Sequence, residues 1–119
     1  MAAGADPSVE QVFRALADPV RRGIVEELGG GPRRAGDLAA ALGTSAPVMS
    51  RHLRTLLDAG VILDERPRHD ARVREFRLRP ESMVALQAWL DQLQRHWDDQ
   101  LRSFKQHVEK QHVEKGHRP

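Results

Sequence analysis

The chain has 119 residues, of which 39% are hydrophobic and 30% charged, with no cysteine and a net charge of +2 at neutral pH. This length suits a single domain, 1–119, that buries part of its apolar surface against a partner. The absence of cysteine excludes disulfides and thiolate metal sites, and neither a long apolar run nor a secretory signal pattern is present, so we expect a cytoplasmic protein without membrane association.

Two helices are predicted in the first quarter of the chain. Ser8 can cap the first, with Gln11 three residues on, and the apolar positions that follow are Val9, Val12, Phe13 and Leu16. Asp18 and Pro19 start the second helix, as a capping carboxylate followed by proline at the first helical position. This helix should end at the glycines and proline of 29–32.

A helix-turn-helix is predicted next. Apolar spacing indicates a short helix over 35–42 that stops at Gly43, and Thr44 and Ser45 then cap a helix over 46–59. The predicted buried face of this second helix consists of Met49, Leu53, Leu56 and Leu57. Two helices joined by a short turn that contains glycine are typical of the helix-turn-helix motif.

Two strand-like runs, 61–66 and 72–78, follow that motif. In the second run Phe76 and Leu78 share a face but Val73 does not, so the strand limits stay open. A charged hairpin directly after a helix-turn-helix is a wing, which we assign to 64–74.

One amphipathic helix is predicted from 80 to 115. Its apolar residues fall at steps of three and four: Met83, Leu86, Leu90, Leu93, Trp97, Leu101, Phe104 and Val108. In a monomer this stripe would be a large exposed apolar patch, so it indicates a dimer contact, with packing inside one chain as the alternative. The predicted fold is mainly α, five helices with a small β-hairpin, divided into a core with wing (8–79) and a dimerisation helix (80–115).

The outward face of helix 46–59 is suited to DNA. At about 100° per residue, Pro47, Arg51 and Arg54 lie opposite Met49. Residues 33–79 also hold ten arginines against six acidic residues, and arginine pairs well with phosphate oxygens and guanine edges. Incidental surface arginines are the alternative. The predicted DNA-binding residues are Ser45, Ala46, Pro47, Val48, Ser50, Arg51, His52 and Arg54 in the helix and Arg66, Arg68, His69 and Arg72 in the wing.

Several segments together resemble the ArsR-type winged helix-turn-helix repressors over roughly residues 9–108. They are "FRALADPVRRGIVEEL", "AGDLAAALGTSAPVMSRHLRTLLDAGVI" and "REFRL"; "WLDQLQRHWDDQL" resembles the subgroup that includes autorepressors with no known inducer site. The resemblance implies a homodimer that contacts operator DNA through helix 46–59 and the wing. It also implies that the first and last helices form the dimer interface, with the residues Val9, Val12, Phe13, Leu86, Trp89, Leu90, Leu93, Trp97, Leu101 and Phe104.

The same family includes metal sensors, and one of their patterns is partly present. Arg34-Ala35-Gly36 stands where arsenic and cadmium sensors have Cys-x-Cys, so that site is absent. His96 and His107 have the spacing of the zinc sensors' histidines, but Gln94 and Lys110 occupy the other two ligand positions and make a poor zinc shell. We therefore expect no metal and no cofactor, with zinc bound by His96 and His107 across the dimer as the alternative.

The expected function is that of a homodimeric, sequence-specific transcriptional regulator, a repressor of its own or a neighbouring operon, with double-stranded operator DNA as its partner. A zinc-responsive derepressor and a protein-interaction module built on the last helix are the alternatives. An enzyme is not expected, because there is no cysteine nucleophile and Gly29-Gly30-Gly31 lacks the Lys-Ser/Thr of a nucleotide-binding loop. The sequence indicates no particular inducer.

Overall fold

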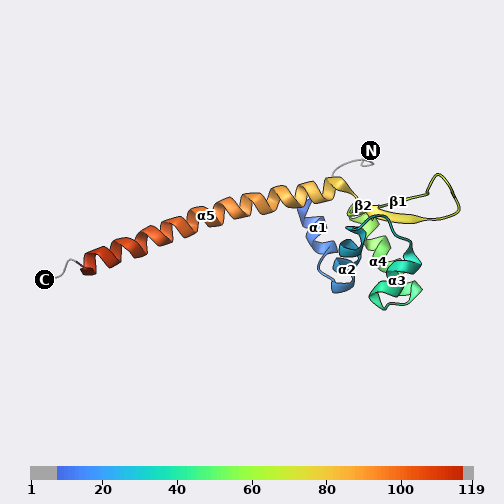
Figure 1. Ribbon diagram of the computed structural model, residues 1–119, viewed down its shortest axis with the longest axis horizontal. Helices are drawn as coiled ribbons and strands as arrows, with labels where there is room; N and C mark the ends of the chain where they lie inside the picture. The colour runs from blue at the N-terminus through green and yellow to red at the C-terminus, as the bar shows by residue number, and fades with distance from the viewer. Residues whose placement is uncertain (1–7, 117–119) are drawn as a thin grey trace. The chain divides into compact units, whose positions relative to one another are not determined.

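The computed structural model describes residues 8–116, with side chains to residue 113. In this part of the chain five helices and a two-stranded hairpin follow one another (Figure 1): α1 (Val9–Ala15), α2 (Pro19–Leu28), α3 (Ala35–Leu42), α4 (Ala46–Asp58), β1 (Ile62–Glu65), β2 (Glu75–Leu78) and α5 (Pro80–Gly116). The predicted fold, mainly α with five helices and a hairpin, is confirmed. The chain forms two compact units, one ending at Leu86 and the other beginning at Gln87.

The helix starts form at the predicted caps. Ser8 and Gln11 make a capping box, in which the Gln11 amide donates to Ser8 Oγ and the Ser8 amide donates to Gln11 Oε1, both at 3.1 Å. Asp18 Oδ2 accepts from the amides of Val20 (2.8 Å) and Arg21 (3.1 Å) at the start of α2. Each pair satisfies amide groups that have no partner within the helix itself.

Two arginines at the start of α2 join it to the end of α1. Arg21 Nε donates to the Ala15 carbonyl at 2.6 Å, and Arg22 Nη1 donates to the carbonyls of Leu16 (2.9 Å) and Ala17 (3.2 Å). The last carbonyls of a helix lack intrahelical partners, so these guanidinium groups cap α1 from outside. The corner between the two helices is therefore held by side chain to backbone bonds.

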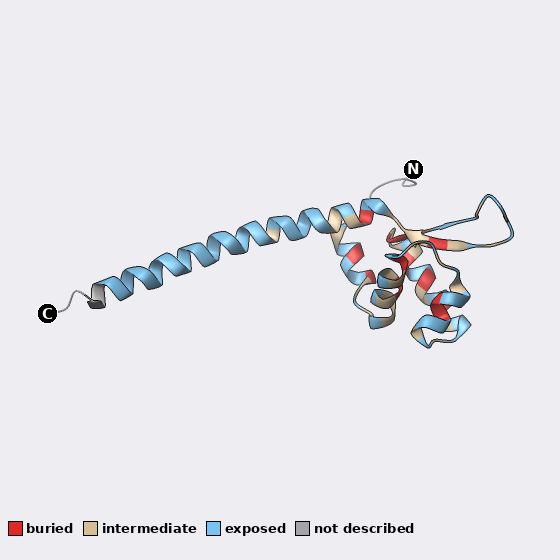
Figure 2. Cartoon of the chain, in the orientation of Figure 1, coloured by how far each residue is buried: buried red, intermediate tan, exposed pale blue. Residues whose placement is uncertain are grey.

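A single hydrophobic core fills the first unit (Figure 2). It consists of Val12, Ala15, Ile24, Leu28, Leu38, Ala39, Met49, Leu53, Leu56, Val61, Ile62 and Phe76. Val12, which is predicted at the dimer interface, is fully buried in its own chain, so its side chain belongs to this core. The tight turn from α3 to α4 is possible because Gly43 adopts φ +64°, in the left-handed region.

The hairpin is shorter than the two predicted runs. Ile62 pairs with Leu78 at one end of the ladder and Glu65 with Glu75 at the other. Between the strands the chain turns back on itself, with the Asp70 amide donating to the Pro67 carbonyl at 3.2 Å. Val73 departs from the alternation because it lies in this loop. Arg33 extends the ladder, since its amide donates to the Phe76 carbonyl at 2.9 Å and the Phe76 amide donates to the Arg33 carbonyl at 2.8 Å.

The first turns of α5 belong to the first unit and are fixed there by Ser82. Its buried hydroxyl donates to the Arg79 carbonyl at 2.7 Å and also lies 3.3 Å from the Val61 carbonyl, so the single hydrogen is shared between them. The second unit is the continuation of α5, where Trp97, Leu101, Phe104 and Val108 are all exposed.

Among the residues described, no helix combines the length and apolar character that crossing a membrane requires.

Candidate nucleic-acid interface

An exposed strip runs along α4 on the side away from the core. Ala46, Pro47, Ser50, Arg51 and Arg54 are exposed, whereas the opposite face is buried. Ser45 is also exposed and caps the helix, its Oγ accepting from the Val48 amide at 3.4 Å. The buried positions are Met49, Leu53 and Leu56. Six of the eight residues predicted to bind DNA through this helix therefore share one accessible surface, which we call the α4 strip (Ser45, Ala46, Pro47, Ser50, Arg51, Arg54); Val48 lies half-buried at its edge.

The two arginines of the α4 strip are only loosely held by their own chain. The guanidinium of Arg51 has no ion pair among the residues that the structure describes. Arg54 Nε lies 3.7 Å from Asp58 Oδ1, and both side chains are more than two thirds exposed. A pair as open as this contributes little stability. Both cations are therefore available to an anionic partner.

His52 faces the start of α2 and not the α4 strip. Its Nδ1 lies 3.9 Å from Asp18 Oδ2, and its side chain is 19% exposed. His52 is thus the one residue predicted to bind DNA through this helix that lies beside the α2 cap, largely covered, and outside the α4 strip. His52 instead joins α4 to the cap of α2.

Asp18 is the acceptor at which these contacts meet. The hydrogen bond from the Arg21 amide does most to lower the pKa of the Asp18 carboxyl below its ordinary value; partial burial opposes this effect. The charge of His52 and the Val20 amide lower the same pKa further. The carboxylate therefore stays ionised while it caps α2 and faces α4.

The cationic side chains of the wing differ in how firmly contacts within the loop hold them. Arg66 Nη1 donates to the carbonyls of Ala71 (3.2 Å) and Arg72 (3.4 Å), so its side chain braces the loop. Arg72 Nε lies 3.2 Å from Asp70 Oδ1 but its side chain is 93% exposed. Arg68 and His69 are exposed near the tip of the loop. All four predicted wing residues are thus exposed to solvent, although the side chain of Arg66 is tied to the loop backbone.

Arg74 is a residue at the base of the wing that the predicted set omits. Its Nε lies 2.9 Å from Asp64 Oδ2 on the opposite strand, and its guanidinium carbon lies 4.8 Å from the centroid of the Phe76 ring. The sequence held a signal for the contact between Arg74 and Phe76, because both belong to the predicted run 72–78 and residues two apart on a strand share a face; in the structure Arg74 lies just before β2. Arg77 makes a similar pair across the hairpin, with Nε 2.9 Å from Glu65 Oε2.

The other predicted residues differ in their exposure. Of the residues expected at a dimer interface, Phe13, Trp89, Leu90, Trp97, Leu101 and Phe104 are exposed, and Val9, Leu86 and Leu93 are half-buried. His96 and His107 are exposed on α5, and eleven residues separate them by about 16 Å along a helix. Within the described part of a single chain, no three histidine, aspartate or glutamate side chains come together as a possible metal site.

The chain, including its helix-turn-helix, is similar to known proteins. Residues 16–65, from the end of α1 to β1, match the helix-turn-helix domain family HTH_20. The HTH-type transcriptional regulator Rv2034 of Mycobacterium tuberculosis is 38% identical over 102 residues, covering 86% of this chain and 90% of that protein. The crystal structure of an ArsR family transcriptional regulator, RHA00566, is 32% identical and covers 76% of this chain and 90% of its own, with a TM-score of 0.64.

The chain belongs to the ArsR family of transcriptional regulators. The predicted resemblance to this family is therefore confirmed. The transcriptional repressor SdpR of Bacillus subtilis is 45% identical over 58 residues, which are 49% of this chain and 64% of SdpR. In this ArsR-family regulator the helix-turn-helix formed by α3 and α4 lies wholly inside the segment that matches the helix-turn-helix family.

Proposed function

We propose that this ArsR-family regulator is a homodimeric repressor that binds an operator of its own or a neighbouring operon. The observation that carries the proposal is the α4 strip, where Arg51 and Arg54 stand exposed beyond the small residues at the start of the helix. A helix that enters the major groove by its N-terminus presents small residues and donors in this order. The kinship with SdpR, which is named a repressor, supports repression as the mode of regulation.

The residues of the α4 strip divide into two roles in this proposal. Ser50 and Arg51 face base edges, with the Arg51 guanidinium suited to the two acceptors of a guanine. Arg54 lies one turn further along the helix and meets a phosphate. At the wing, Arg68, His69 and Arg72 contact the DNA backbone or the minor groove, where the negative potential favours cations.

The dimer part of the proposal rests on the exposed apolar residues of α5. Trp97, Leu101, Phe104 and Val108 fall within about 60° of one another around the helix, at about 100° per residue. Each is at least 46% exposed in the single chain. We call this face the α5 seam. A second copy would cover it with an identical face, as two-fold symmetric interfaces do.

Binding to the chain's own promoter tests the proposal. The full chain is titrated against a duplex of that promoter and against a scrambled duplex of the same composition, at several salt concentrations. We expect affinity for the promoter to exceed that for the scrambled duplex by about a thousandfold or more and to fall steeply with salt. Equal affinities for the two duplexes would show that the protein reads no operator there.

A zinc response is tested in the same assay. The positions beside His96 and His107 that complete the zinc sensors' ligand set hold Gln94 and Lys110, an amide and a cation, which are poor partners for zinc. We expect added Zn²⁺ to change operator affinity by less than about tenfold. A larger change would assign the regulator a metal-dependent release from DNA.

A further inference from the structure

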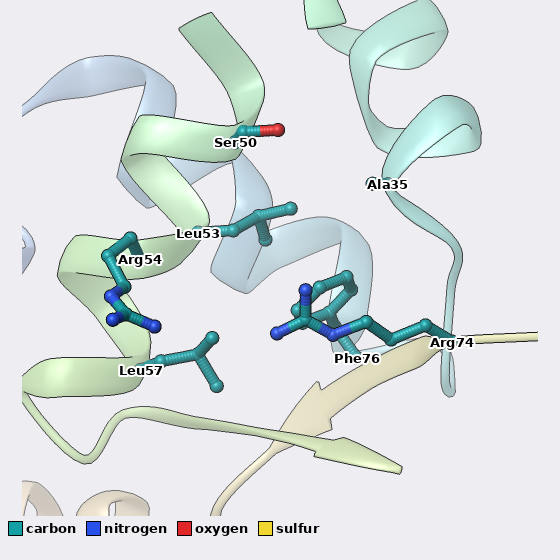
Figure 3. A pocket seen from close by; sticks show the side chains of 7 residues that line it. All are labelled: Ala35, Ser50, Leu53, Arg54, Leu57, Arg74 and Phe76. Carbon is teal, nitrogen blue, oxygen red and sulfur yellow. The ribbon is translucent and has the colours of Figure 1, made fainter. Parts of the chain in front are cut away.

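A pocket of about 250 Å³ lies between α4 and β2 (Figure 3). Its floor is apolar, formed by Leu53, Leu57 and Phe76. Leu53 and Phe76 are part of the core, with 3% and 2% of their surface exposed, and Leu57 is half-buried. The floor is therefore built from side chains whose positions are fixed by packing below them.

The rim of the pocket is cationic. Arg54 from α4 and Arg74 from the wing both line it, and their guanidinium groups face the same space from opposite sides (Figure 3). Arg74 is held in place by Asp64 at 2.9 Å and by the Phe76 ring. Arg54 has only the 3.7 Å contact with Asp58 and is 75% exposed. A guanidinium carries five N–H donors, so each arginine has donors left beyond those its carboxylate partner accepts.

We propose that this pocket binds a small organic carboxylate with an apolar body. The carboxylate would lie between Arg54 and Arg74, which can each donate two parallel hydrogen bonds, and the apolar body would cover Leu53, Leu57 and Phe76. The volume equals that of about eight water molecules, which suits a ligand of about ten non-hydrogen atoms. Inorganic phosphate would accept hydrogen bonds from the two arginines of the rim but would leave the apolar floor in contact with water.

The pocket also connects with DNA binding. Ser50 and Arg54 line the pocket and belong to the α4 strip. A carboxylate that draws the Arg54 guanidinium into the pocket removes it from a phosphate of the operator, so the ligand would act as an inducer that lowers affinity for DNA. This consequence rests on the proposed function, whereas binding of the carboxylate does not.

The binding test uses benzoate, its neutral analogue benzamide and inorganic phosphate, each titrated into the full chain without DNA and followed by amide chemical shifts in NMR. We expect saturable benzoate shifts at residues 50–57 and at Phe76, and binding of benzamide and phosphate that is at least about tenfold weaker. Equal binding of benzoate and phosphate would show that the apolar floor contributes nothing. The absence of benzoate shifts in the pocket would overturn the proposal outright.

Two matched variants at and just before β2 locate the site. Arg74→Gln removes the pocket guanidinium, and we expect it to weaken benzoate binding by about tenfold or more. Arg77→Gln removes an arginine three residues further along, on β2, that pairs across the hairpin at the same 2.9 Å but does not line the pocket. This variant should leave benzoate binding unchanged. Equal effects of the two substitutions would overturn the assignment.

A DNA titration separates the two proposals. With benzoate at saturation we expect the Kd for the promoter duplex to rise by about tenfold or more. If benzoate binds while this Kd stays constant, the inducer role is wrong. If the protein binds no operator but still binds benzoate in the pocket, the proposed repressor function is wrong and the carboxylate site remains.

Discussion

Truncating Phe104 to alanine should weaken the dimer by an amount that follows from its exposure. Phe104 is 66% exposed in the single chain. A phenylalanine side chain offers roughly 200 Å² of surface, so about 130 Å² of apolar area reaches solvent. At about 25 cal/mol per Å², complete burial of this area against a second copy contributes about 3 kcal/mol for each copy.

A homodimer loses this contribution twice when Phe104 is replaced. If the interface covers only half of the area, Phe104→Ala still costs about 3 kcal/mol per dimer, which raises the dimer dissociation constant by about a hundredfold. Sedimentation equilibrium over a range of protein concentrations measures this constant directly. Circular dichroism of the variant checks that the helix content is retained.

Two valines on α5 provide the control. Val108→Ala and Val113→Ala are the same change at positions that are 46% and 54% exposed, but five residues advance a helix by about 500°, which leaves the side chains about 140° apart. Only Val108 lies on the α5 seam, so Val108→Ala should raise the dissociation constant and Val113→Ala should not. The reasoning is refuted if Phe104→Ala dimerises like the wild type, or if the two valine variants weaken the dimer equally.

Four further results are expected. Arg51→Ala should reduce the preference for operator over scrambled duplex by about tenfold, whereas Arg54→Ala should lower the affinity for the two duplexes equally. If Arg51→Ala lowers the affinity for both duplexes equally, the division of roles is contradicted. Leu56→Ala, at a fully buried position, should lower the free energy of unfolding in urea by about 2–5 kcal/mol, and a loss below about 1 kcal/mol would mean that the core is not packed as described. Gly43→Ala should cost about 1 kcal/mol or more in the same assay because residue 43 has φ +64°, and a neutral effect would argue against the left-handed turn. The pKa of the Asp18 carboxyl is lowered in the folded protein, so its charge stabilises the fold above the ordinary value of 3.8, and this stabilisation is lost as the pH falls below 3.8. The melting temperature of the wild type should therefore exceed that of Asp18→Asn by less and less over that range. A difference that does not change with pH would exclude this role.

Local signals in the sequence predicted the helices well. Helix signals act within a few residues, so the caps at Ser8 and Asp18 and the stop at Gly43 can be recognised without knowledge of the fold. The end of α4 lies one residue from its predicted limit of 59. The strands were overestimated because residues 66–74 make turn hydrogen bonds that interrupt the ladder, such as Asp70 to Pro67. A sequence of alternating residue types does not reveal where such a turn begins.

Contacts between distant residues explain where the structure places two predicted site residues differently from their helical spacing. The spacing of His52 on its helix does not reveal its neighbour Asp18, which lies 34 residues earlier in the chain. Val12 has the spacing of an interface residue, but the packing of four helices and the hairpin around it makes it part of the core. The pocket under Arg54 and Arg74 depends on α4 and the wing approaching each other in space, which no single segment encodes.

The corner between α1 and α2 has a consequence for the order in which the first unit folds. Arg21 and Arg22 donate to carbonyls only five or six residues back, so little chain entropy opposes closing the corner. The bridge between Arg33 and Phe76 joins residues 43 apart (76 minus 33) and requires the intervening helices first. We therefore expect the corner to form early and the hairpin to form late, and the amide protons of the hairpin to exchange faster in the native state than those of the corner. On this expectation α4, which contacts the corner through His52 and Asp18, opens less often than the wing.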